Sequence, residues 1–144
     1  MKVKKYILFL EMKLISYICT MNSEDERGDN LRELIFTEEF FSFYQQLDTK
    51  VQTKFDYTIE VVRNVNILTT NFVKHLEGTE LYEMRVSVGS NAYRTIMFTM
   101  DHDNINLARR IILLNAFLKK STKDYKKQVK IATDILKRLS DGKD

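Results

Sequence analysis

The chain lacks proline and tryptophan, and it has only four glycines and one cysteine among its 144 residues. Without proline there is no Pro-rich linker, and neither internal repeats nor low-complexity segments appear. The single Cys19 excludes a disulfide within the chain and is typical of a reducing compartment, so we expect a cytoplasmic protein. The chain has neither a CxxC pair nor a His/Cys cluster, the patterns that would indicate a structural zinc site. We therefore predict neither a metal nor a cofactor.

Long apolar runs are also missing. The segment Met1 to Thr20 has a basic start and an apolar middle, like a secretory signal, but Glu11 and Lys13 interrupt the middle and no small-x-small cleavage site follows. No uninterrupted stretch reaches the ~20 residues of a membrane span, so no membrane association is predicted. We interpret residues 1–30 as an N-terminal extension that ends in a polar linker, residues 22–30. The alternatives are a true signal peptide and a chain that begins at Met21.

Charge is distributed unevenly along the chain, although the net charge is only +3. Between Leu118 and Leu139 there are eight basic residues against two acidic ones, whereas residues 21–60 carry ten acids against four bases. A local basic excess is the electrostatic footprint of a polyanion binder, although a solvated helix face produces the same pattern. The length and the hydrophobic content of 44% are those of one ordinary globular domain.

Three consecutive strands are predicted between Leu81 and Lys120. The first shows the period-2 alternation of a half-buried strand, with Tyr82, Met84, Val86 and Val88 on one side. After the turn signal Gly89-Ser90, residues 92–100 form a second strand rich in aromatic and β-branched residues. Residues 111–118 are almost entirely apolar, as expected for a strand that is covered on both faces.

The turn sets the register of this hairpin and brings two arginines together. If Val88 pairs with Asn91, Arg85 falls directly opposite Arg94. Like charges opposite each other destabilise a strand pair, so the arrangement suggests a site for a bound anion. The alternative is that Glu83, diagonal to Arg94 on the same face, neutralises both arginines.

Helices are predicted before and after the three strands in the sequence, so the predicted fold class is α+β. After a short strand at residues 31–36, Thr37 is a candidate N-cap for a helix that continues to Leu47, and a second helix begins at Asp48 or Thr49 and continues to about Asn66. Residues 71–80 are interpreted as a linker. Ser121 is the candidate cap of a last helix that ends near Leu139.

Four motifs follow one another in this part of the chain: the strand LYEMRV, the spaced AYRTIMF, the apolar strand IILLNAF and the following LKK. In series they resemble the RelE/HigB superfamily of bacterial type II toxins, in particular its HigB-like, phage-derived branch. The similarity extends in order and spacing from about Leu31 to Leu139. It implies a RelE-like domain over residues 31–144, with a small antiparallel-rich sheet, an N-terminal helical hairpin packed on it and a C-terminal helix. Asn115, which stands where the family often has histidine, and the long loop 101–110 depart from the family pattern.

The resemblance implies metal-independent RNA cleavage by a cluster of Arg, Lys and Tyr side chains. Arg94 is then the strongest candidate to hold the scissile phosphate, with Arg85 beside it and Lys119 and Lys120 at the end of the apolar strand. A cluster of cations lowers the pKa of a lysine, so that one lysine can act as a base. Tyr125 is a candidate for base stacking or proton handling, or it belongs to the core; Lys119 and Lys120 are alternatively solubilising charges at a strand end.

Other basic residues are expected to contact the RNA backbone: Lys74, Lys123, Lys126 and Lys127. His75 and His102 have a side chain suited to acid–base chemistry, but neither belongs to a recognisable nucleophile or metal motif.

The implied function is that of a toxin of a type II toxin-antitoxin system, an mRNA interferase that cleaves ribosome-bound message. Its implied partners are mRNA, the ribosome and a cognate antitoxin with a helix-turn-helix domain. Two alternatives remain at this stage. ParE-type relatives with the same fold inhibit DNA gyrase, and a degenerate member would bind nucleic acid without cleaving it.

Overall fold

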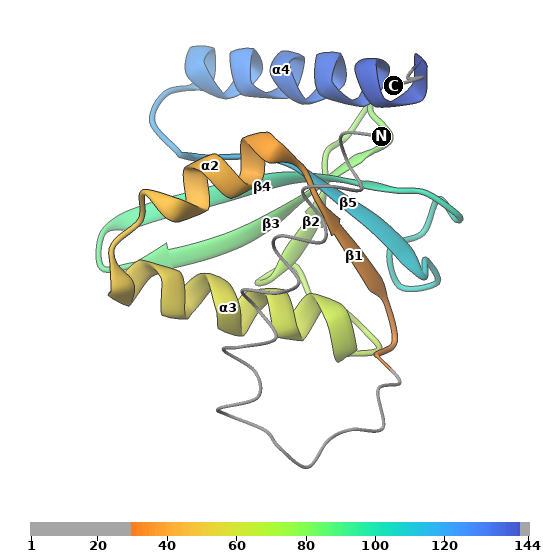
Figure 1. The fold of residues 1–144 in the computed structure, drawn as a ribbon, viewed down its shortest axis with the longest axis horizontal. Helices are drawn as coiled ribbons and strands as arrows, with labels where there is room; N and C mark the ends of the chain where they lie inside the picture. Colours follow the sequence, from red (N-terminus) through yellow and green to blue (C-terminus); the bar gives the residue numbers. More distant parts are fainter. Residues whose placement is uncertain (1–29, 142–144) are drawn as a thin grey trace.

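A computed structural model describes residues 30–141 of the chain, and these residues form a five-stranded mixed sheet with helices on both faces (Figure 1). The predicted extension and linker at residues 1–30 lie outside the described residues, except for Asn30. The elements, in chain order, are β1 (Glu33–Phe36), α2 (Glu38–Gln45), α3 (Thr49–Asn64), β2 (Val73–His75), β3 (Leu81–Val88), β4 (Asn91–Thr99), β5 (Arg110–Leu118) and α4 (Thr122–Asp141).

The sheet has the strand order β1-β5-β4-β3-β2, with β1 parallel to β5 and every other pair antiparallel. The predicted hairpin register is confirmed, because Val88 pairs with Asn91 and Arg85 with Arg94. Gly89 makes the tight turn possible with a φ of 60°, a conformation that side chains with a Cβ rarely adopt. Between β4 and β5 the register shifts at Ile96/Met97, so that β5 contains one residue more than its partner there.

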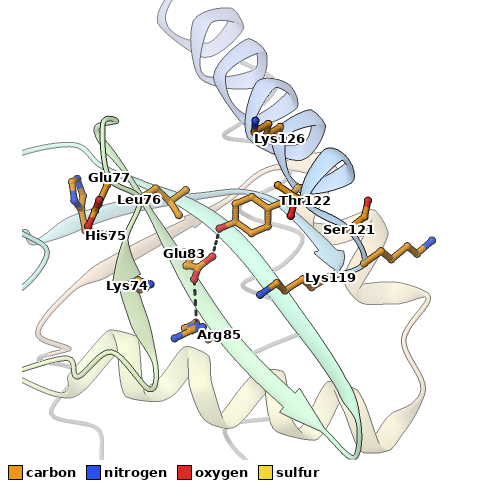
Figure 2. Close-up of a pocket in the computed structure, with 12 residues that line it drawn as sticks. Lys74, His75, Leu76, Glu77, Glu83, Arg85, Lys119, Ser121, Thr122 and Lys126 are labelled. Atoms are coloured by element: carbon orange, nitrogen blue, oxygen red, sulfur yellow. Dashed lines mark hydrogen bonds and ion pairs between the residues drawn. The ribbon is translucent and has the colours of Figure 1, made fainter.

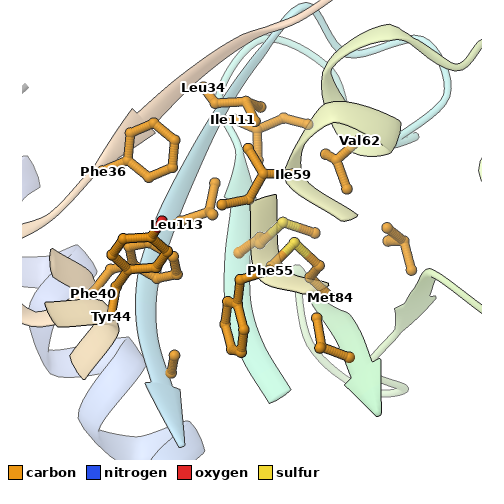
Figure 3. Close-up of a cluster of buried hydrophobic side chains, with 14 of the residues drawn as sticks. Leu34, Phe36, Phe40, Tyr44, Phe55, Ile59, Val62, Met84, Ile111 and Leu113 are labelled. Carbon is orange, nitrogen blue, oxygen red and sulfur yellow. The ribbon is translucent and has the colours of Figure 1, made fainter. Parts of the chain in front are cut away.

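The two faces of the sheet are covered by different helices. The predicted helical hairpin, α2 and α3, packs its apolar side chains against one face of the sheet and forms the larger core with it (Figure 3). In this core Phe55 is fully buried among Phe40, Tyr44 and Tyr93. Helix α4 covers the opposite face and forms a second core with β4 and β5. The α+β class and the predicted arrangement of hairpin, sheet and C-terminal helix are confirmed.

The helix caps follow from the sequence. The side chain of Thr37 accepts a hydrogen bond from the amide of Phe40, and Asp48 accepts one from the amide of Val51, so each satisfies an amide that the first helical turn leaves free. Helix α3 ends at Asn64, two residues before the predicted end.

One expectation about the chain between α3 and β3 was wrong. The segment that we interpreted as a linker contains β2, a strand of three residues that pairs with β3 at the edge of the sheet. Three residues are too short to show a period of two, so the strand depends on its ladder with β3 rather than on a local pattern.

Arg32 fixes the end of the domain where β1 begins. Its side chain is fully buried and donates only to backbone carbonyls, those of Val62, Val65, Asn66, Ile105 and Asn106. The guanidinium therefore satisfies carbonyls at the C-terminal end of α3 and in the β4–β5 loop at the same time. This connection holds β1, α3 and the loop together on the side away from α4.

Candidate active site

A cleft of about 580 Å³ lies between the edge strand β2, the middle of β3 and the beginning of α4 (Figure 2). Two carboxylates and five cationic side chains line it: Glu77, Glu83, Lys74, Arg85, Lys119, Lys120 and Lys126. The excess of cations makes the cleft suited to an anionic ligand. His75, Ser121, Thr122 and Tyr125 also contribute to its walls.

The β-ladders and a helix start bring these residues together. Lys74 pairs with Glu83 across β2 and β3, and the pleat places Glu83 and Arg85 on the same face of β3. Strand β5 ends just before Lys119, and Ser121 then accepts a hydrogen bond from the amide of Asp124 at 3.1 Å as α4 begins. The cap therefore turns the chain so that the first turns of α4 form one wall of the cleft.

Glu83 is the centre of the charge network beneath the cleft. It is buried, and its carboxylate lies 3.3 Å from Nε of Arg85 and 3.6 Å from Nε of Arg94. The hydroxyl of Tyr125 donates a third interaction to the same carboxylate. Of the two interpretations of the arginine pair, neutralisation by Glu83 is therefore present in the structure, and the repulsion between the guanidinium groups is compensated internally.

The two opposed arginines differ in access to the cleft. The side chain of Arg85 is 30% exposed and lines the cleft, whereas that of Arg94 is 7% exposed and is not among the lining residues. Arg94 also donates to the carbonyl of Tyr93 at 3.0 Å. Burial lowers the pKa of Arg94, the charge of Glu83 opposes that effect, and the nearby Arg85 adds to it. Arg85 is thus the arginine that a ligand in the cleft can reach.

Tyr125 belongs both to the core and to the cleft, so the two interpretations of this residue are compatible. Its ring packs edge-on against Phe117 at 5.6 Å between centroids, while its hydroxyl reaches Glu83. Burial first, and the hydrogen bond to Glu83 second, raise the pKa of Tyr125 well above its ordinary value. Tyr125 therefore remains a neutral hydrogen-bond donor at physiological pH.

The remaining predicted residues divide between the cleft and the outer surface. Lys123 and Lys127 are exposed on α4 outside the cleft lining. His75 lines the cleft, with its Nε2 2.8 Å from the carbonyl of Thr79, whereas Nδ1 of His102 accepts from the amide of Asn104 in the β4–β5 loop. The sequence suggested Glu83 only as a neutralising charge, and its contact with Tyr125 depends on how α4 docks.

Within residues 30–141, no three His, Cys, Asp or Glu side chains are grouped as a metal site would require. The helices of that same part of the chain include none that is long and apolar enough to cross a membrane. What the cleft does offer is a set of positive charges and hydrogen-bond donors that can hold a phosphodiester and stabilise the charge that develops on it.

Comparisons with known proteins agree with the fold. Residues 42–137 match the family described as phage derived protein Gp49-like (DUF891). No curated protein matches the chain. Among solved structures, a double arginine-to-alanine mutant of the E. coli toxin RelE in the free state is similar, with a TM-score of 0.50 and 17% sequence identity over 69% of this chain and 96% of that one. At this identity the likeness to RelE shows the fold.

Proposed function

The chain belongs to the phage-derived Gp49-like family, and from this membership and the chemistry of the cleft we propose that it is the toxin of a type II toxin-antitoxin system that cleaves mRNA without a metal. The observation that carries the proposal is the convergence of Arg85, Lys119, Lys120 and Lys126 with Tyr125 on one cleft. The RelE-like fold supports it as well.

Cleavage of RNA requires activation of the 2′-hydroxyl, stabilisation of the charge on the phosphate and protonation of the leaving oxygen. In our proposal Arg85 grips the scissile phosphate, because it is the accessible member of the arginine pair. Lys119 and Lys120 supply the remaining charge, and one of them accepts the proton of the 2′-hydroxyl as it attacks phosphorus while the other donates a proton to the leaving 5′-oxygen. Arg94 is a positioning residue that acts through Glu83 and keeps Arg85 and Tyr125 in place.

The proposed substrate is ribosome-bound mRNA, and the proposed regulator is a cognate antitoxin with a helix-turn-helix domain. Lys74, Lys123, Lys126 and Lys127 would contact the RNA backbone beside the scissile phosphate, since all four side chains are exposed on β2 and α4. An antitoxin that silences such a toxin has to cover or neutralise this basic region.

Induced expression in a bacterial host, followed by primer extension on cellular mRNA, tests the proposal. We expect growth arrest and discrete new 5′ ends with the wild type. Arg85→Gln should lower their yield by roughly 10-fold or more, because a hydrogen bond to a charged group is lost. Lys137→Ala, an exposed change near the far end of α4, is the matched control and should behave as the wild type.

Other outcomes would contradict the proposal. Growth arrest with intact mRNA and impaired DNA supercoiling would identify an inhibitor of gyrase. Normal growth at a high level of folded protein would identify a degenerate member that binds nucleic acid without cleaving it.

A further inference from the structure

Two aromatic rings meet at the β2 edge of the sheet, on the side that α3 covers. Tyr57, on α3, is 59% exposed, and no other Phe or Tyr in residues 30–141 is classed as exposed. Its ring lies against that of Phe72, just before β2, with 6.3 Å between centroids and a tilt of 52°. Phe72 is partly buried against the larger core, whereas Tyr57 remains exposed, so part of the Tyr57 ring is accessible to a ligand.

The segment that carries Phe72 is fixed to the cleft through Arg85. The amide of Arg85 donates to the carbonyl of Phe72 at 2.8 Å, and its guanidinium donates to the carbonyl of Thr70 at 3.2 Å. Figure 2 shows Arg85 below Glu83, on the side of the cleft away from α4. A single strand that leaves the cleft past Arg85 and turns around the β2 edge of the sheet would reach Phe72 and then Tyr57.

Exposed lysines lie on α3 and β2, the elements beside Tyr57 and Phe72. Lys50, Lys54 and Tyr57 are all exposed and are spaced by four and three residues, so they share one face of α3. Lys74 is exposed on β2 and lines the cleft itself. Aromatic side chains that alternate with lysines are the usual device for holding single-stranded nucleic acid, since bases stack on the rings and the lysines follow the phosphates.

We propose that Tyr57, supported by Phe72, is a stacking platform for a base of single-stranded RNA that flanks the scissile phosphate. This inference rests on the proposed function, because it assumes that the cleft holds RNA. The neighbouring lysines favour RNA over a protein partner, because lysine is depleted in protein–protein interfaces.

Binding of a fluorescent, 2′-O-methylated oligoribonucleotide, measured by anisotropy at low salt, tests the platform. Tyr57→Ala should weaken binding of an eight-nucleotide probe by about 5- to 100-fold, the range found when one stacked base loses its aromatic partner. Tyr57→Trp should retain the affinity. A dinucleotide probe, which fills only the cleft, should bind the wild type and Tyr57→Ala equally.

Ile67→Ala is the matched control, because Ile67 is 66% exposed in the loop after α3 but offers no ring. If the wild type and Tyr57→Ala bind the eight-nucleotide probe equally, the platform is wrong while the proposed function stands. A loss of antitoxin binding in place of RNA binding would likewise overturn the platform and assign Tyr57 to a protein interface. If the wild type binds neither probe, the platform is wrong, whereas the proposed function is tested independently by primer extension on cellular mRNA.

Discussion

At the scale of single residues, two arginines with the same place in the hairpin have different environments. Arg85 and Arg94 face each other across β3 and β4, and both lie within 4 Å of Glu83. The sequence predicted the pairing because a two-residue turn sets the register. It did not predict which arginine is covered, since that depends on where α4 crosses the sheet.

The difference in burial between the two arginines predicts that Arg94→Ala and Arg85→Gln lower the stability of the fold by different amounts. Arg94→Ala leaves the buried Glu83 with one cation fewer and should lower the free energy of unfolding by on the order of 3 kcal/mol. Arg85→Gln changes a partly exposed group and should lower it by less than about 1 kcal/mol. Urea denaturation of the two variants measures both values. Equal destabilisation would show that the two guanidinium groups are energetically equivalent.

At the scale of elements, α4 is attached to the rest of the domain near both of its ends. Close to its beginning the hydroxyl of Tyr125 reaches Glu83 on β3, and close to its end Arg138 contacts Glu39 on α2 at 2.7 and 3.2 Å. The sequence predicted the apolar stripe of α4, but the two polar contacts connect residues that are far apart in the chain. Their position depends on the angle at which the helix packs.

The pair at the far end predicts a pH dependence of stability. Burial alone would raise the pKa of Glu39, but the hydrogen bond from Arg138, a backbone hydrogen bond and the charge of Arg138 together outweigh burial and lower the pKa below 4.5. A carboxyl with a lowered folded pKa stabilises the fold above its unfolded pKa of 4.5, and the contribution is lost as the pH falls from there through the folded pKa.

Glu39→Gln should therefore lower the free energy of unfolding by about 0.5 kcal/mol at pH 7, and the difference from the wild type should disappear below the folded pKa of Glu39. Urea denaturation at pH 7 and pH 3 measures it. Glu38→Gln, in the same helical turn, controls for the effect of a negative charge at the start of α2. A difference that grew as the pH fell would contradict the ion-pair explanation.

At the scale of the whole molecule, basic side chains from the middle and the C-terminal part of the described chain are gathered on one cleft. Lys74 comes from β2, Arg85 from β3, and Lys119, Lys120 and Lys126 from the end of β5 and the start of α4. The basic excess near the C-terminus was visible in the sequence as a polyanion-binding signal. The sheet adds Lys74 and Arg85 to this basic region, and the charge pattern along the sequence does not connect these two residues with the C-terminal lysines.

The gathered charge predicts a strong salt dependence of RNA binding. With five cations around the cleft, the logarithm of the binding constant for single-stranded RNA should fall with the logarithm of salt concentration with a slope of roughly −3.5. Lys120→Ala should reduce the slope by about 0.7, because one phosphate contact is lost. Lys137→Ala should leave it unchanged. A titration of anisotropy against potassium chloride measures all three slopes, and a flat dependence would exclude phosphate binding in the cleft.

The sequence by itself determined the order of the elements other than β2, the caps Thr37 and Ser121, and the register that opposes Arg85 and Arg94. Periodicity, cap residues and turn residues act over a few neighbouring positions, so they can be recognised along the chain. Only the tertiary structure decided the rest: the short strand β2, the burial of Arg94, the contact of Tyr125 with Glu83 and the contact of Tyr57 with Phe72. Each of these depends on which element covers a given face of the sheet, and that is settled by packing between residues that are distant in the sequence.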